Sequence, residues 1–246
     1  MRYLPMALIA LSLLVSSLVA ASERAQRYHE LQSQAYLLCA NALMYFEAQG
    51  GPPDPGHLAA YQGALSRLDG LTRQLGQPPE LSQPLDEISA LLSELEQLPR
   101  SEAPLYPARL IALLGAHEQL ESRAAQHYRQ LEPEVPARVR LLHRQSQALG
   151  RLLLQAQARS ARVLGVYSVA LSAAEFAAMD EGINQGFASL LAELPEHAER
   201  LQKQQRSFRF VRGQLLSSDF GKSIASAEPY VARSMLELDQ LAAQRR

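Results

Sequence analysis

Proline marks the breaks in this chain of 246 residues. Apart from Pro5, the prolines fall in six groups, at 52, 53 and 55; 78, 79 and 84; 99, 104 and 107; 133 and 136; 195; and 229. Proline lacks an amide donor and clashes with the preceding helical turn, so such groups mark helix ends and first turns. The runs between them are rich in Leu, Ala, Gln, Glu and Arg, which favour helices over strands. The sequence therefore predicts an all-α protein.

Eight segments carry apolar residues at helical spacing, which predicts an antiparallel bundle of about eight helices. Ser172 with Glu175 forms a capping-box pattern, and Asp54 with Pro55 offers an N-cap and a first-turn proline. The predicted helices span 23–49, 56–76, 81–98, 105–131, 136–170, 173–193, 196–217 and 223–245.

The chain shows signs of an internal duplication. The helix lengths run long, medium, medium, long in each half, and Gln32-Ser33-Gln34-Ala35 recurs as Gln145-Ser146-Gln147-Ala148. Each copy falls in the first long helix of its half. Two similar four-helix units, residues 22–132 and 133–246, are the architecture that follows, although both units can share one continuous bundle.

Residues 1–21 are typical of an export signal. Arg2 precedes an apolar run from Met6 to Ala21 that ends in small residues, so cleavage after Ala20 or Ala21 is expected. The run is shorter than the roughly 20 residues of a usual membrane span, but an uncleaved N-terminal anchor is the alternative. We expect a periplasmic protein of a Gram-negative type of cell. Its membrane contact is either absent or limited to this segment, which then tethers it to the inner membrane.

The charge balance argues against nucleic acid as a partner. The formal net charge is −1, and loss of Arg2 with the leader makes it −2, whereas nucleic-acid-binding domains carry a basic excess. Hydrophobic residues make up 47% of the chain, which indicates a globular domain. Its single cysteine, Cys39, cannot form an internal disulfide and is expected to be a small buried side chain.

The sequence contains no motif for catalysis or for a cofactor. There is no GxSxG, P-loop, HExxH or CxxCH pattern, so we expect a protein that is not an enzyme and has no cofactor. His117 with Glu121, and Glu193 with His197, stand at helical spacing, but two ligands alone do not make a metal site. No metal is expected.

The predicted helix 136–170 is unusual in its charge. Between Val135 and Ala174 there is no acidic residue, yet six arginines occur, and four of them project within a sector of about 40°: Arg140, Arg144, Arg151 and Arg162. One interpretation is a site for a small anion, because arginine forks suit carboxylate or phosphate groups. The other is a solvated face that pairs with acidic residues of later helices, among them Glu175, Asp180, Glu181, Glu193, Glu196 and Glu199.

Gln145 falls on the apolar side of the same helix. A buried amide must find partners, so it either bonds a neighbouring helix or helps to hold a ligand.

The stretch Arg144-Gln145-Ser146-Gln147-Ala148-Leu149-Gly150-Arg151-Leu152 resembles a motif of one sensor family. These are the helical periplasmic input domains of type IV pilus chemotaxis transducers and nitrate sensors, whose first long helix carries a stretch like RQRMLSQRL. Arg144, Gln145, Arg151 and Leu152 match it. The resemblance implies an exported, often duplicated four-helix bundle that senses a small ligand or a partner protein as a dimer. The anion-binding arginine of nitrate sensors aligns with Ser146, so nitrate itself is not implied.

Two functions follow from these observations. The first is sensor-like binding of a small anionic ligand or an envelope protein, with Arg144, Gln145 and Arg151 as the candidate binding residues and a homodimer as a possible assembly. The second is a structural or adaptor protein that packs on an envelope complex without a ligand pocket. An apolar patch above a few hundred Å² along one helix pair would favour the second.

Overall fold

The computed structural model describes residues 4–47, 52–161, 164, 171–217 and 224–244, with side chains from Ala21 onward. Its α-helices are joined by turns and short 3₁₀ segments, and this part of the chain contains no strand, so the all-α prediction is confirmed. The helices are α1 (Leu4–Tyr45), α2 (Pro55–Gln74), α3 (Pro79–Gln97), α4 (Tyr106–Leu131), α5 (Ala137–Ser160), α6 (Ala173–Glu193), α7 (Ala198–Leu215) and α8 (Glu228–Ala243).

The predicted caps are present. The Asp54 carboxylate accepts a hydrogen bond from the Gly56 amide at the start of α2, where Pro55 occupies the first turn. At the start of α6 the Ser172 hydroxyl accepts from the Glu175 amide, and the Glu175 carboxylate accepts from the Ser172 amide. These local bonds satisfy amides that have no partner within the helix, so both helices begin where the sequence predicts.

Three predicted helix ends differ from the structure by five residues or more, and one of them is the start of α8, at Glu228 and not at 223. Helix α1 begins at Leu4, so the predicted start at residue 23 lies inside one continuous helix. Helix α5 ends at Ser160, ten residues before the predicted end at 170. The Ser160 hydroxyl donates to the Gln157 carbonyl, which also accepts the Ala161 amide, and such a local bond competes with helix continuation. Residues 162–163 and 165–170 lie outside the described part of the chain.

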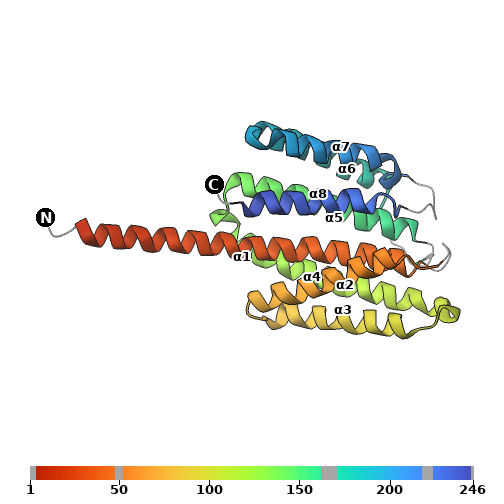
Figure 1. Ribbon diagram of the computed structural model, residues 1–246. Coiled ribbons are helices and arrows are strands. Elements are labelled where there is room, and N and C mark those ends of the chain that lie inside the picture. The colour runs from red at the N-terminus through yellow and green to blue at the C-terminus, as the bar shows by residue number, and fades with distance from the viewer. Residues whose placement is uncertain (1–3, 48–51, 162–163, 165–170, 218–223, 245–246) are drawn as a thin grey trace.

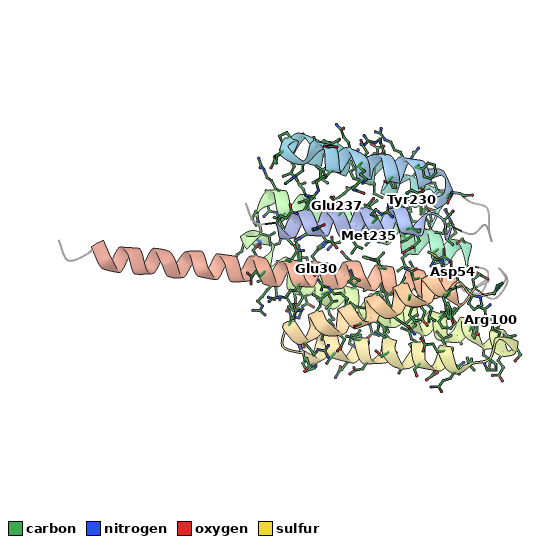
Figure 2. The ribbon with its side chains drawn as sticks, viewed as in Figure 1. Glu30, Asp54, Arg100, Tyr230, Met235 and Glu237 are labelled. Atoms are coloured by element: carbon green, nitrogen blue, oxygen red, sulfur yellow. The ribbon has the colours of Figure 1, made fainter. Side chains whose placement is uncertain are left out.

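The helices pack in two sets that lie side by side (Figure 1). In unit 1, which comprises helices α1 to α4, α1 packs against α2 and α4, and α3 packs against the same two helices. In unit 2, which comprises helices α5 to α8, α5 packs against α6 and α8, and α7 packs against the same two helices. The two units meet mainly through α1 and α5. Figure 2 labels Glu30 of α1 and Met235 of α8, which lie on the helices beside this junction.

Helices α1 and α5 run parallel along their junction. Gln26 contacts His143, Ser33 contacts Ser146, and Gly150 lies against Tyr36, so residue numbers rise together on both helices. The serines of the two repeated tetrapeptides therefore face each other, with 3.4 Å between their hydroxyl oxygens.

The N-terminal part of α1 runs beyond the ends of the other helices in Figure 1. The leader predicted for residues 1–21 falls, except for Ala21, in the part whose side chains are not described. From Ala21 onward α1 is packed, and Ala25 and Leu31 are fully buried. Among the described residues, none of the helices has the length and apolar character of a membrane span.

The apolar core extends through both units as one cluster. Tyr61 and Leu68 of unit 1 and Phe187 and Phe208 of unit 2 are among its largest fully buried side chains. Cys39 is also fully buried and free, and desolvation raises the pKa of its thiol well above the usual range. The prediction of a small buried side chain is confirmed.

Candidate functional site

The three residues singled out in the sequence line one groove. This groove, called here the α5–α6 groove, has a volume of about 540 Å³ and includes Arg144, Gln145, Arg151, Gly182, Gln185 and Ser189. Tyr36 of α1 and Glu121 of α4 complete its wall. Its volume lies within the 300–1,000 Å³ range that is typical of small-molecule sites.

Arg144 and Arg151 are exposed and form no ion pair within the described structure. Seven residues separate them on one helix, which places them about 10 Å apart along its axis and on nearly the same face. The groove therefore carries two guanidinium groups against one carboxylate, Glu121.

The other described arginines of α5 have structural partners. Arg138 pairs with Glu196, with 3.3 Å between Nη1 and Oε1. Arg140 donates to the carbonyls of Glu132 and Val135, and Arg159 donates to the Leu215 carbonyl. Arg162 lies outside the described residues.

The solvated-face interpretation predicted ion pairs between the arginine stripe and acidic residues of later helices, and two of these acidic residues have other partners in the structure. Asp180 accepts two bonds from Arg212, and Glu175 closes the cap of α6. Only Arg138, which is outside the predicted stripe, pairs with one of them. Arg144 and Arg151 are thus left as the two cations of α5 that face the groove without a protein partner among the described residues.

Gln145 is buried and fixes α5 to α6. Its Nε2 donates to the Ile183 carbonyl at 3.1 Å, so the amide bonds a neighbouring helix, one of the two roles that the sequence left open. A Cβ at Gly186 would overlap the Gln145 Oε1, whereas a Cβ at Gly182 would meet nothing. Gly186 thus gives the amide the room to reach the α6 backbone.

Tyr36 and Glu121 form the junction between this groove and a second hollow. Burial and the nearby Glu121 carboxylate raise the pKa of Tyr36 well above its ordinary value. Glu121 accepts a hydrogen bond from Gln32 Nε2 at 3.2 Å. Among the described residues it forms no ion pair with an arginine.

The second hollow, called here the α4–α5 chamber, has a volume of about 530 Å³. It shares Tyr36, Glu121 and Arg151 with the α5–α6 groove and continues along α4 and the C-terminal part of α5. Its further lining includes Ile111, Leu114, His117, Leu154 and Ala158. The His117 Nε2 has no hydrogen-bond partner, and burial lowers the pKa of this imidazole to about 4.

A buried polar network lies behind the groove, where α1, α4, α5 and α8 meet. The His29 and His143 rings stack with centroids 3.9 Å apart. Gln147 donates to His29 Nδ1, so the His29 proton is on Nε2, which donates to Asp239 Oδ1 at 2.7 Å. Burial and the neighbouring His29 lower the pKa of His143 well below its ordinary value.

This network is not a hydrolytic triad, although Ser33 lies 3.4 Å from His29 Nε2. A triad histidine must accept the serine proton on the nitrogen that faces it, whereas this nitrogen already donates to Asp239. Ser33, His29 and Asp239 are also buried. Their arrangement holds helices together.

Sequence reasoning missed Tyr36 and the α4–α5 chamber, and it considered Glu121 only with His117, as a pair of possible metal ligands. No local pattern points to them, because α1, α4 and α5 bring them together from distant positions in the chain. The pair Gly182 and Gly186 carried a usable signal, since two glycines one turn apart inside a helix indicate a close approach at one face. His29 and Asp239 are 210 residues apart and gave no signal.

Comparison of the chain with models of protein families, with curated proteins and with solved structures gave no match. Within the described residues, no three His, Cys, Asp or Glu side chains are grouped as a metal ion would require. The class that the fold and this site define is an all-α helical bundle with a cationic groove.

Proposed function

We propose that this chain is a non-enzymatic helical-bundle protein that binds a small anion in the α5–α6 groove. The observation that supports the proposal is the pair Arg144 and Arg151, exposed in one hollow and without a described ion-pair partner. Guanidinium forks bind carboxylate and phosphate groups with paired hydrogen bonds. Gln145 takes part as the residue that fixes α6 against α5, so it shapes the groove from within.

The test is a thermal-shift titration with acetate, phosphate and other small anions. A ligand that binds only the folded state raises the melting temperature, and the shift keeps growing with ligand concentration above the dissociation constant. We expect an anion-dependent rise for the wild-type protein that is lost in Arg144→Gln and Arg151→Gln. Arg138→Gln is the matched control on the same helix, because Arg138 is paired with Glu196 and does not line the groove. An unchanged shift in both groove variants would contradict the proposal.

We also propose that the protein acts in the periplasm, exported through residues 1–21. The support is the pattern of that segment, in which Arg2 precedes an apolar run that ends in small residues. The intact mass of the protein from the envelope fraction tests this. A mature chain that starts at Ala21 or Ser22 indicates a cleaved leader, and an intact Met1 in that fraction indicates a tether to the inner membrane. Recovery in the cytoplasm with Met1 intact contradicts export.

The adaptor function is the second candidate, and one observation favours it. Phe210 of α7 is 71% exposed and lies against Tyr230 of α8, with ring centroids 5.2 Å apart. Tyr230 is labelled in Figure 2. Of the other exposed large apolar side chains among the described residues, Leu236 also lies on α8, whereas Leu105 and Ile111 belong to the 3₁₀ segment before α4 and to α4. A pull-down of envelope partners that is lost in Phe210→Ser and kept in Arg144→Gln would favour the adaptor.

A further inference from the structure

The α5–α6 groove and the α4–α5 chamber meet at one residue that carries charge. Arg151 lines both hollows, together with Tyr36 and with Glu121, whose carboxylate accepts a hydrogen bond from Gln32. Along α5, the groove is lined from Leu141 to Arg151 and the chamber from Arg151 to Ala158. A ligand held at Arg151 therefore has space on both sides.

The two hollows differ in chemistry. On the groove side, Arg144 supplies a second guanidinium, and Gln185 and Ser189 supply polar groups. On the chamber side, the walls beyond Arg151 include the aliphatic side chains of Ile111, Leu114, Leu154 and Ala158, beside the polar Glu118 and Gln155 and the buried His117 imidazole, whose Nε2 has no partner. Among the described residues, no second cation lies on this side. An inorganic anion would therefore fill the groove side alone and leave these aliphatic side chains in contact with water.

From this juxtaposition we infer that the ligand is an amphipathic carboxylate, with its anionic group at Arg144 and Arg151 and its apolar body in the α4–α5 chamber. This inference rests on the proposed function and narrows it to one class of ligand. The stretch of α5 from Arg151 to Ala158 rises about 10 Å, which suits a phenyl ring on a short chain. Such a body removes apolar surface from water on both sides of the contact, so affinity grows with its size until the chamber is filled.

The test is calorimetric titration of the full-length protein with acetate, 3-phenylpropionate and the neutral 3-phenylpropionamide. We expect 3-phenylpropionate to bind about tenfold or more tightly than acetate, because it buries a ring. The amide is expected to lose at least about tenfold, because it presents no charge to Arg144 and Arg151. These three probes need no variant, so the inference stays testable even where a substitution impairs folding.

A substitution in the chamber separates the two ideas. Ala158→Leu narrows the chamber and is expected to remove the advantage of 3-phenylpropionate while leaving acetate binding unchanged. Ala192→Leu is the matched control, on an exposed position of α6 outside both hollows. Equal affinity of the wild-type protein for acetate and 3-phenylpropionate overturns the inference and leaves the anion site standing. Absence of binding by every anion overturns the proposed function as well.

Discussion

Helices α1 and α5 carry the same four-residue motif in different surroundings. When the two copies are aligned, Leu31 and Leu38 of α1 take the places of Arg144 and Arg151 of α5. Both leucines are fully buried, whereas both arginines are exposed in a groove. Helix α2 packs against α1 more extensively than α6 packs against α5. Equivalent positions thus form closed core in unit 1 and an open, cationic groove in unit 2.

This contrast indicates which unit has a surface free to bind. A leucine in a closed core contributes through the apolar area that it buries, and a charge there would be desolvated. An arginine at a groove keeps its charge hydrated and available to a ligand. The comparison predicts that exchanging the residue types lowers the free energy of unfolding much more in unit 1 than in unit 2.

The largest expected effect comes from placing the arginine of α5 into α1. Leu38→Arg buries an unpaired charge, so we expect a loss of more than about 4 kcal/mol in the free energy of unfolding. The reverse exchange, Arg151→Leu, changes an exposed residue and is expected to stay within about 1 kcal/mol. Urea unfolding followed by circular dichroism measures both. Similar losses in the two variants would break the contrast between closed and open positions.

The next effect concerns pH. His117 belongs to α4 of unit 1 but lines the α4–α5 chamber, and its folded-state pKa of about 4 lies below the ordinary value of 6.5. The unfolded chain therefore binds a proton more readily, and stability falls as the pH drops from about 6.5 to 4. This one group accounts for a loss of roughly 3 kcal/mol. Burial lowers the pKa of His143 in the same direction and adds to the loss.

Urea unfolding at pH 7 and pH 4.5 measures this dependence. We expect His117→Leu to flatten the decline, because the variant has no imidazole to protonate in the unfolded state. If the free energy of unfolding falls equally in the variant and in the wild-type protein, burial does not lower the pKa of His117, and water reaches the chamber wall more readily than the core around Leu38.

A smaller effect tests how closely α6 approaches α5. Gly186→Ala displaces the buried Gln145 amide from the Ile183 carbonyl, and we expect a loss of about 1–2 kcal/mol. Gly182→Ala is the matched control one turn away, where a Cβ meets nothing. It is expected to stabilise the protein by up to about 1 kcal/mol, because alanine favours a helix over glycine. Thermal unfolding measures the melting temperatures of both variants. Equal shifts in both would refute the role of Gly186 in making room for the Gln145 amide.

The smallest expected effect is on stability at the arginines themselves. Arg144→Gln and Arg151→Gln remove charges that have no ion-pair partner among the described residues, so each free energy of unfolding should change by less than about 0.5 kcal/mol. Urea unfolding in low salt measures this. A clear loss of stability would mean that these arginines support the fold, and it would weaken their assignment to a ligand.

Local chemistry explains why much of the fold was predictable. The Ser172 capping box and the Asp54 N-cap are formed by residues within three positions of each other, and both were predicted correctly. The end of α5 was not, since no proline or glycine stands near Ser160 and the helix stops at a side-chain bond to the Gln157 carbonyl. The helical period was enough to place Arg144 and Arg151 on one face of α5, but the groove that they share with Gln145 depends on the packing of α6, α1 and α4 around that face.

The sequence by itself determined the helical class, most helix starts and the two cations of α5, because proline positions, caps and the helical period act over a few residues. Only the tertiary structure decided that Arg144 and Arg151 stay unpaired, that Gln145 bonds α6, and that Tyr36 and Glu121 join the groove to the chamber. These outcomes depend on which helices pack together. Packing brings together residues as distant as His29 and Asp239, and no local pattern encodes that proximity.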